Sequence, residues 1–163
     1  MAVDQVGRDD APVTRAAVRV AGDADFAGIM ALAAEVEHWF GPMVDEPGFH
    51  RAVRTHIDRG TALVAGDGVS GGLLFDPAGP KYHIDWMVVS EQARGTGIGR
   101  ALVDEAMRRF VQAPSTIEVV TFGPDHPGAE SRAFYERLGY TAGPMTDSGP
   151  EGGSRQIFTI DVR

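Results

Sequence analysis

The sequence predicts a single α/β domain in which helices flank a mixed, mostly antiparallel sheet. The first observation is composition: 163 residues, of which 43% are hydrophobic and 23% charged, suit one globular domain with its own core. The second is pattern, because short β-branched runs alternate with longer segments whose apolar residues recur at helical spacing. The third is the glycine turn Gly66-Asp67-Gly68 between two apolar runs, which is typical of an antiparallel hairpin.

The elements are expected in the following places. Residues 1–14 are polar and aperiodic, so we expect a flexible N-terminal tail ahead of a domain at 15–163. Asp23 can cap the first helix, which Gly41 and Pro42 end. Further helices are predicted at 47–58, 98–111 and 129–138, and strands at 17–20, 61–65, 71–75, 82–89, 116–122, 140–145 and 155–162.

Composition also excludes several classes of protein and site. The chain has no cysteine, which excludes disulfides, thiolate metal sites and a thiol nucleophile. The net charge of −8 argues against nucleic acid as a partner, because such binding needs Lys and Arg against phosphate. No apolar run approaches the ~20 residues of a membrane span, and the histidines show no metal-ligand spacing. We therefore expect a cytoplasmic protein with no metal and no membrane partner.

The most informative segment is rich in glycine and runs Arg94-Gly95-Thr96-Gly97-Ile98-Gly99-Arg100. It follows a predicted strand and opens a predicted helix. A helix start offers unpaired N–H groups and a partial positive charge, and glycine lets a diphosphate approach the backbone closely. A P-loop would need Gly-Lys-Ser/Thr, which is absent here. A dinucleotide-binding turn and a turn without any ligand remain as alternatives.

This segment resembles the acetyl-CoA signature Arg-x-x-Gly-x-Gly of the GCN5-related N-acetyltransferases (GNAT), met here at Arg94, Gly97 and Gly99. A second segment, residues 131–140, is similar to the family's Phe-Tyr-Glu-(Lys/Arg)-x-Gly-(Phe/Tyr) segment. The two motifs have the order of the family, with one strand candidate between them, and the resemblance covers nearly the whole chain. Many members carry Asn where this chain has Gly128, so no side-chain contact with CoA is carried over there.

The resemblance implies that two central strands separate to admit acetyl-CoA. In this family the strand before the glycine turn offers backbone groups to the pantetheine arm, and by position these belong to Met87, Val88 and Val89. The diphosphate is expected on the N–H groups of residues 94–100. Core packing is the alternative role for the strand residues, and both roles can hold because the contact is made by the backbone.

The resemblance also implies direct attack of an amine on a thioester. Tyr135 stands where the family usually donates a proton to the leaving thiolate; a ring packed on the sheet is the alternative. Strand alternation places on one face the residues His83, Asp85, Met87 and Val89. We therefore expect Asp85 beside the cofactor as the base, acting directly or through water. A structural carboxylate is the alternative for Asp85, and His83 is a second candidate base.

The acceptor is expected beside the first two helices and the last hairpin, which in this fold determine specificity. Glu35, Trp39 and Phe40 form an aromatic and acidic cluster that can hold an ammonium group. Arg155 could reach a substrate carboxylate. Core packing, solvated surface and an exposed turn are the alternatives for these residues.

Two functions of different classes are compatible with these features. The first is an acetyl-CoA-dependent N-acetyltransferase acting on a small-molecule amine or a peptide amine. The second is a catalytically silent acyl-CoA-binding sensor or interaction domain. Tyr135 and Asp85 favour the enzyme. The sequence leaves the acceptor and the oligomeric state open, a homodimer included.

Overall fold

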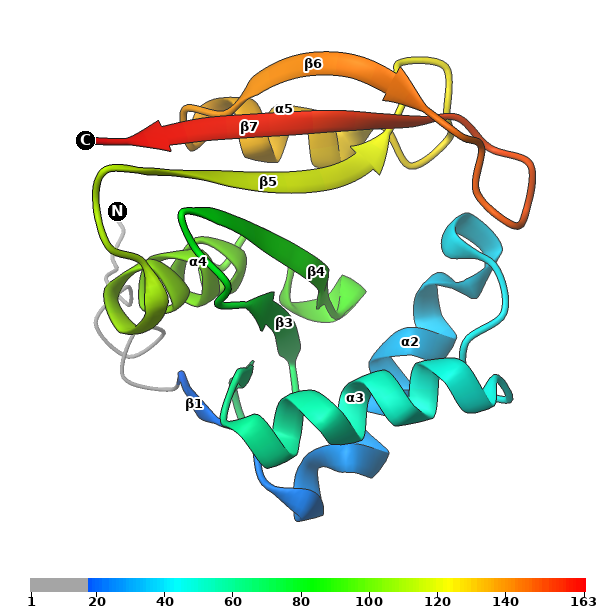
Figure 1. Cartoon of the computed structure of the whole chain (residues 1–163). Helices are drawn as coiled ribbons and strands as arrows, with labels where there is room; N and C mark the ends of the chain where they lie inside the picture. The colour runs from blue at the N-terminus through cyan, green and yellow to red at the C-terminus, as the bar shows by residue number, and fades with distance from the viewer. Residues whose placement is uncertain (1–17) are drawn as a thin grey trace, which may run out of the picture.

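The β-sheet is the frame on which the rest of the chain is arranged. In the computed structural model, which describes residues 18–163, seven strands form one sheet in the order β1-β2-β3-β4-β5-β7-β6 (Figure 1). All neighbouring strands are antiparallel except β4 and β5, which are parallel. The prediction of a mixed, mostly antiparallel sheet is confirmed. The tail predicted at residues 1–14 lies outside the described residues.

The elements differ from the predicted ones mainly at their ends. The strands are β1 (Arg19–Val20), β2 (Ala62–Ala65), β3 (Gly71–Asp76), β4 (Lys81–Val89), β5 (Ser115–Phe122), β6 (Thr141–Thr146) and β7 (Arg155–Val162). The helices are α2 (Phe26–Phe40), α3 (Pro47–Arg59), α4 (Ile98–Phe110) and α5 (Glu130–Arg137), with 3₁₀ turns η1 (Asp23–Asp25) and η2 (Glu91–Ala93). No helix within residues 18–163 has the length and apolar character needed to cross a membrane.

The central parallel strands are paired over only part of their length. The register runs from Lys81 opposite Thr116 to Ile84 opposite Val119. Beyond this point β4 continues beside β3, whereas β5 continues beside β7 as far as Phe122. Figure 1 shows β4 and β5 side by side at one end and separating toward the other. The splayed pair expected from the resemblance is therefore present.

A β-bulge in β4 corrects the prediction about its two faces. Leu74 pairs with Trp86 and Phe75 with Ile84, so Asp85 has no partner residue on β3. An extra residue reverses the alternation of side chains beyond it. Met87 and Val89 therefore pack against the same cluster as Tyr82 and Ile84, while Trp86 and Val88 join the clusters beneath α2 and α3. The prediction that His83 and Asp85 share a face with Met87 and Val89 is wrong.

Helices cover both faces of the sheet. Leu102 of α4 and Tyr135 of α5 belong to one buried cluster together with Leu73 of β3. Ile29 of α2 and Val53 of α3 belong to a second cluster on the opposite face. Figure 1 shows α3 in front of the sheet and α5 behind β5 and β7. The separated ends of β4 and β5 thus lie between two helical layers.

Candidate functional site

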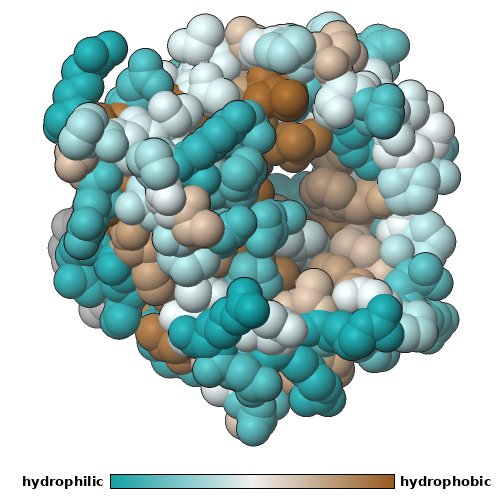
Figure 2. Space-filling view, in the orientation of Figure 1, coloured by the Kyte–Doolittle hydropathy of each residue, from teal (hydrophilic) through white to brown (hydrophobic). Residues whose placement is uncertain are grey.

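A cavity of about 630 Å³ occupies the gap between the separated strands. Its walls come from residues 84–89 of β4, residues 119–122 of β5, the end of α2, the glycine segment before α4, and α5. Figure 2 shows it as a hollow with apolar side chains inside, below β5 and β7 in the orientation of Figure 1. The splay of the sheet therefore creates a site rather than a packed core.

Most residues singled out from the sequence line this cavity. Both candidate catalytic residues, Asp85 and Tyr135, do so. All of the candidate cofactor residues except Thr96 are included: Met87, Val88, Val89, Arg94, Gly95, Gly97, Ile98, Gly99 and Arg100. Among the acceptor candidates, Trp39, Phe40 and Arg155 line the cavity and Glu35 does not.

The glycine segment turns the chain from β4 into α4. Gly95 and Gly97 have φ values of +79° and +90°, a conformation that other residues rarely adopt. Gly97 is the N-cap of α4 and offers no side chain to the first N–H groups of the helix. Those groups have no partner within a helix, so they can bind an anion at this edge of the cavity.

Glu35, predicted on the acceptor side, contacts the start of this segment. Its carboxylate accepts a hydrogen bond from the Ser90 hydroxyl (3.1 Å) and another from the Glu91 N–H (3.0 Å). These bonds connect α2 to the chain that leads from β4 into the glycine turn. In this position Glu35 supports the turn.

Gly99 lies in a closely packed part of the protein. A Cβ built at this position would lie 3.0 Å from the ring of Phe134 and 3.5 Å from Val89. The first turn of α4 therefore lies directly against α5. A side chain at Gly99 would disturb this contact as well as any approaching ligand.

Tyr135 lies in the cavity wall and is only 4% exposed. Its ring packs edge-on against Tyr140, with 5.4 Å between the ring centroids. Burial raises the pKa of the Tyr135 hydroxyl above its usual value, and Tyr140 adds to the shift. Within residues 18–163 this hydroxyl has no hydrogen-bond partner, so its proton is available to a ligand.

The end of α5 explains why the segment 131–140 contains a glycine at position 139. Gly139 has a φ of +98°, and the N–H of Tyr140 donates to the carbonyl of Tyr135 (3.0 Å). Such a left-handed residue closes the helix and turns the chain away from its axis. The turn leads the chain into β6 and leaves Tyr135 at the cavity.

Asp85 stands where β4 leaves β5, and it pairs with a histidine of α3. Its Oδ2 lies 3.1 Å from Nε2 of His56, whose Nδ1 lies 2.7 Å from Oγ1 of Thr61. The side chain of Asp85 is 43% exposed, whereas that of His56 is 12% exposed. The carboxylate is thus held between the cavity and solvent, where it can accept a proton.

His83 makes a different set of contacts. Its Nε2 lies 3.1 Å from Oε1 of Glu118, and its Nδ1 lies 3.9 Å from Oδ2 of Asp76. Lys81 also pairs with Glu118 (3.2 Å). These residues form a polar row across β3, β4 and β5, and none of them lines the cavity.

The end of the cavity beside α2 has aromatic walls. The rings of Phe40 and Phe122 have centroids 4.8 Å apart, and those of Trp39 and Phe122 are 6.5 Å apart. A Cβ at Gly128 would lie 2.7 Å from the Phe122 ring and 3.2 Å from that of Trp39. The absence of a side chain at Gly128 therefore makes room for these two rings.

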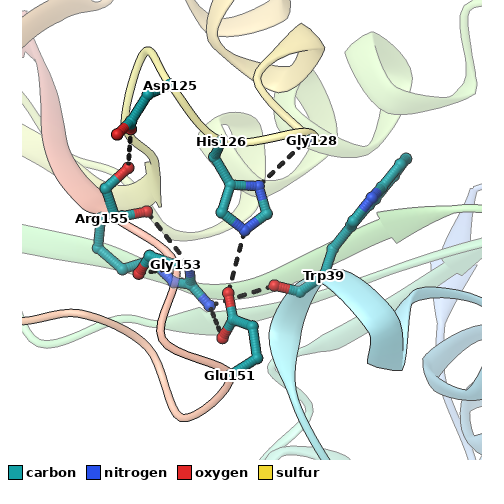
Figure 3. Close-up of polar contacts among 8 residues, drawn as sticks. Trp39, Asp125, His126, Gly128, Glu151, Gly153 and Arg155 are labelled. Carbon is teal, nitrogen blue, oxygen red and sulfur yellow. Dashed lines mark hydrogen bonds and ion pairs between the residues drawn. The ribbon is translucent and has the colours of Figure 1, made fainter.

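A polar network of Arg155, Glu151 and His126 lies beside these rings (Figure 3). Glu151 lies between the other two, with Oε1 2.7 Å from Arg155 Nη2 and Oε2 3.0 Å from His126 Nε2. The remaining terminal N–H groups of Arg155 donate to backbone carbonyls of its own loop and to that of Trp39 (3.4 Å). The network thus ties the β6–β7 loop to the end of α2.

The hydrogen bonds of this network fix its charges. The N–H of Gly128 donates to Nδ1 of His126 (2.9 Å), so the ring proton sits on Nε2 and is donated to Glu151. Partial burial works against the charged form of Glu151, but hydrogen bonds from Arg155 and His126 outweigh it and lower its pKa to about 2. Arg155 and Glu151 form a compensated ion pair beside a neutral imidazole.

Three residues of the site were missed by reasoning from the sequence: His56, His126 and Glu151. His56 meets Asp85 across 29 residues of chain, and His126 meets Glu151 across 25. No local pattern predicts such contacts. The one available signal was the i,i+4 spacing of Glu151 and Arg155 in the last hairpin.

Comparison with known proteins identifies one family. The family model described as an acetyltransferase (GNAT) domain matches residues 58–142, which is more than half of the chain. A search of curated proteins finds no match.

Solved structures with this fold include several acetyltransferases. Ribosomal-protein-alanine N-acetyltransferase from Brucella melitensis has a TM-score of 0.68 and 20% identity, covering 89% of this chain and 99% of that one. The protein yncA from Salmonella typhimurium, solved with its cofactor acetyl-CoA, has a TM-score of 0.66 and 19% identity, covering 90% and 93%. A phosphinothricin acetyltransferase from Sinorhizobium meliloti, in complex with acetyl-CoA, has a TM-score of 0.65 and 23% identity, covering 89% and 87%.

Proposed function

The chain belongs to the GNAT acetyltransferase family, and on that premise we propose that it transfers an acetyl group from acetyl-CoA to a primary amine. The observation that carries this proposal is the cavity between β4 and β5, with anion-binding N–H groups at one edge and a buried phenol in its wall. If the glycine turn bound no ligand, the protein would need neither the separated strands nor the cavity.

The residues around the cavity fit acetyl-CoA. Beyond Ile84 the edge of β4 that faces β5 has no strand partner, so its backbone can pair with the amides of a pantetheine arm. Met87, Val88 and Val89 lie on this stretch. The N-terminus of α4 can hold the diphosphate, and Arg94 and Arg100 add positive charge at that edge.

Bound acetyl-CoA would supply the activated acetyl group, and the amine nitrogen would form the new bond as the bond from carbonyl carbon to sulfur breaks. We assign Tyr135 the role of donating its hydroxyl proton to the departing sulfur. Its raised pKa keeps the phenol protonated across the neutral range. A thiolate in the same apolar surroundings would also become more basic, which favours the transfer.

We assign Asp85 the role of accepting the proton that the amine loses, directly or through water. It lines the cavity and reaches solvent, whereas His83 lies outside the cavity against Glu118. A partly exposed carboxylate can return the proton to bulk water after each turnover. His56 holds the carboxylate in place during the reaction.

An assay of CoA release with a panel of amines tests the proposal, with an acetyl-CoA-induced rise in Tm measured in parallel. Acetyl-CoA-dependent release of CoA that requires an amine supports the enzyme. A rise in Tm without turnover of any amine would favour the catalytically silent acyl-CoA-binding domain instead.

A further inference from the structure

The acceptor end of the cavity is apolar and rich in rings. Its walls include Val36, Trp39 and Phe40 from α2 and Phe122 from β5, and Val36 and Phe122 are each 2% exposed. Stacked or edge-on contact with such rings favours a ligand that carries an aromatic or branched apolar group. Val36 and Phe122 are already covered by the protein, whereas Trp39 and Phe40 remain partly exposed and offer the surface that an apolar group would cover.

The charges at this end do not favour an anionic substrate. Among the described lining residues from α2, β4, β5 and β7, only Asp85 and Arg155 are charged. Arg155 is 8% exposed, and its terminal nitrogens already donate to Glu151 and to backbone carbonyls. Arg94 of the glycine segment also lies over the Trp39 ring (5.4 Å), at the edge that we assign to the diphosphate. A substrate carboxylate would have to displace Glu151 from Arg155 or compete with the diphosphate for Arg94, whereas the carboxylate of Asp85 lines the cavity with His56 as its partner.

The β6–β7 loop is fastened against α2 and narrows this end of the cavity. Beyond the bond from Arg155 to Trp39, a Cβ built at Gly41 would lie 2.7 Å from Cγ of Pro150. Figures 1 and 3 show the loop reaching the end of α2. An extended peptide would need this space, whereas a compact amine would not.

From these features, and resting on the proposed function, we propose that the acceptor is a small primary amine carried on an aromatic or branched apolar group, with no carboxylate beside the nitrogen. Asp85 attracts the ammonium form on arrival and then takes its proton. The walls formed by Trp39, Phe40 and Phe122 hold the apolar group.

The experiment compares amines that differ in one feature, using the full chain and saturating acetyl-CoA. Phenethylamine is compared with phenylalanine, and isoamylamine with leucine, because each pair differs only by the carboxylate. We expect kcat/KM to favour the amine without a carboxylate by about 10²-fold or more, the cost of burying a charge without a partner. Phenethylamine should also exceed ethanolamine and the N-terminal amine of a short peptide.

A variant pair tests the aromatic wall. Phe40→Ala should raise the KM for phenethylamine by about tenfold and reduce its advantage over ethanolamine, with acetyl-CoA binding unchanged. Phe26→Ala is the control, because Phe26 begins the same helix, packs beneath Arg54 and does not line the cavity. It should leave the order of the amines as it is in the wild type.

The outcomes separate this inference from the proposed function. Equal or better use of phenylalanine, of ethanolamine or of the peptide would overturn the inference while leaving an acetyltransferase. An unchanged preference in Phe40→Ala would also overturn it. Failure to acetylate any amine, with acetyl-CoA still raising the Tm, would overturn the proposed function and the inference together.

Discussion

Tyr135 and Tyr140 form a matched pair of buried phenols, of which only Tyr135 lines the cavity. Tyr135→Phe removes the proton that we assign to the leaving sulfur while keeping the ring. We expect kcat to fall by about 10²–10⁴-fold with little change in the KM for acetyl-CoA. Tyr140→Phe is the control, since its buried hydroxyl has no partner to lose within the described residues. The measurement is the steady-state kinetics of both variants. A wild-type rate in Tyr135→Phe would show that Tyr135 only packs against the sheet and does not donate the proton.

Asp85 and His83 occupy the same strand but differ in their access to the cavity. Asp85→Asn removes the proposed base, so we expect the rate to fall most at low pH, where the amine is protonated, and to recover in part at high pH. His83→Gln should leave the rate profile unchanged, because His83 lies against Glu118 outside the cavity. The measurement is kcat/KM against pH for both variants. A larger loss in His83→Gln than in Asp85→Asn would reverse the assignment.

Single residues differ in how far the sequence reveals their role. Gly97 and Tyr135 could be singled out because each belongs to a short motif, and both line the cavity. The partners of Arg155 could not, because Trp39 approaches it from a helix 116 residues earlier in the chain. The contact of Glu35 with Ser90 could not be predicted either, because the two residues lie far apart in the sequence. Glu35 was therefore grouped with its neighbours Trp39 and Phe40 and predicted beside the acceptor.

At the scale of elements, the glycine segment can be tested against a glycine of similar conformation elsewhere. Gly97 and Gly60 have φ values of +90° and +76°, and neither would bring a Cβ within 4 Å of other atoms. Gly97→Ala and Gly60→Ala should therefore each lose about 1 kcal/mol of stability through backbone strain. Only Gly97→Ala should also lose most of the rise in Tm caused by acetyl-CoA, because its Cβ would occupy the space that we propose for the diphosphate. Differential scanning fluorimetry with and without acetyl-CoA measures both effects, and an equal rise in the two variants would contradict this role.

Strand β4 shows why an element can be predicted while its faces cannot. Its β-branched and aromatic residues predict the strand, and regular alternation then predicts which residues share a face. The bulge at Asp85 breaks that alternation, and it arises from the register with β3, a pairing that the residues of β4 alone do not encode. Asp85, the residue at this bulge, has no partner on β3 and lies 3.1 Å from His56 of α3.

At the scale of the whole molecule, the cavity depends on a topology that composition and periodicity do not specify. Periodicity predicts the strands and helices, but the parallel pairing of β4 with β5 over only a few residues is a long-range property. The resemblance to the GNAT family was what made the splay predictable. The walls of the acceptor end come from α2, β5 and β7, which meet only in the folded chain.

The network around Glu151 gives a prediction about the stability of the whole fold, because it joins the β6–β7 loop, the β5–α5 loop and the end of α2. Folding lowers the pKa of Glu151 to about 2 from an ordinary value of 4.5. The stabilisation is therefore complete above pH 4.5 and is lost as the pH falls toward 2. Glu151→Gln should reduce the free energy of unfolding by about 2–3 kcal/mol at pH 7, since Arg155 then loses a charged partner.

Urea unfolding of wild type and Glu151→Gln between pH 7 and pH 3 tests this prediction. We expect the difference in free energy of unfolding between the two proteins to shrink below pH 4.5, because the wild-type carboxyl then gains its proton on unfolding and the variant has none to gain. Glu136→Gln, on the exposed face of α5, is the control and should match the wild type throughout. A difference that stays constant down to pH 3 would mean that the loop is held by packing alone, with the ion pair contributing nothing that depends on charge.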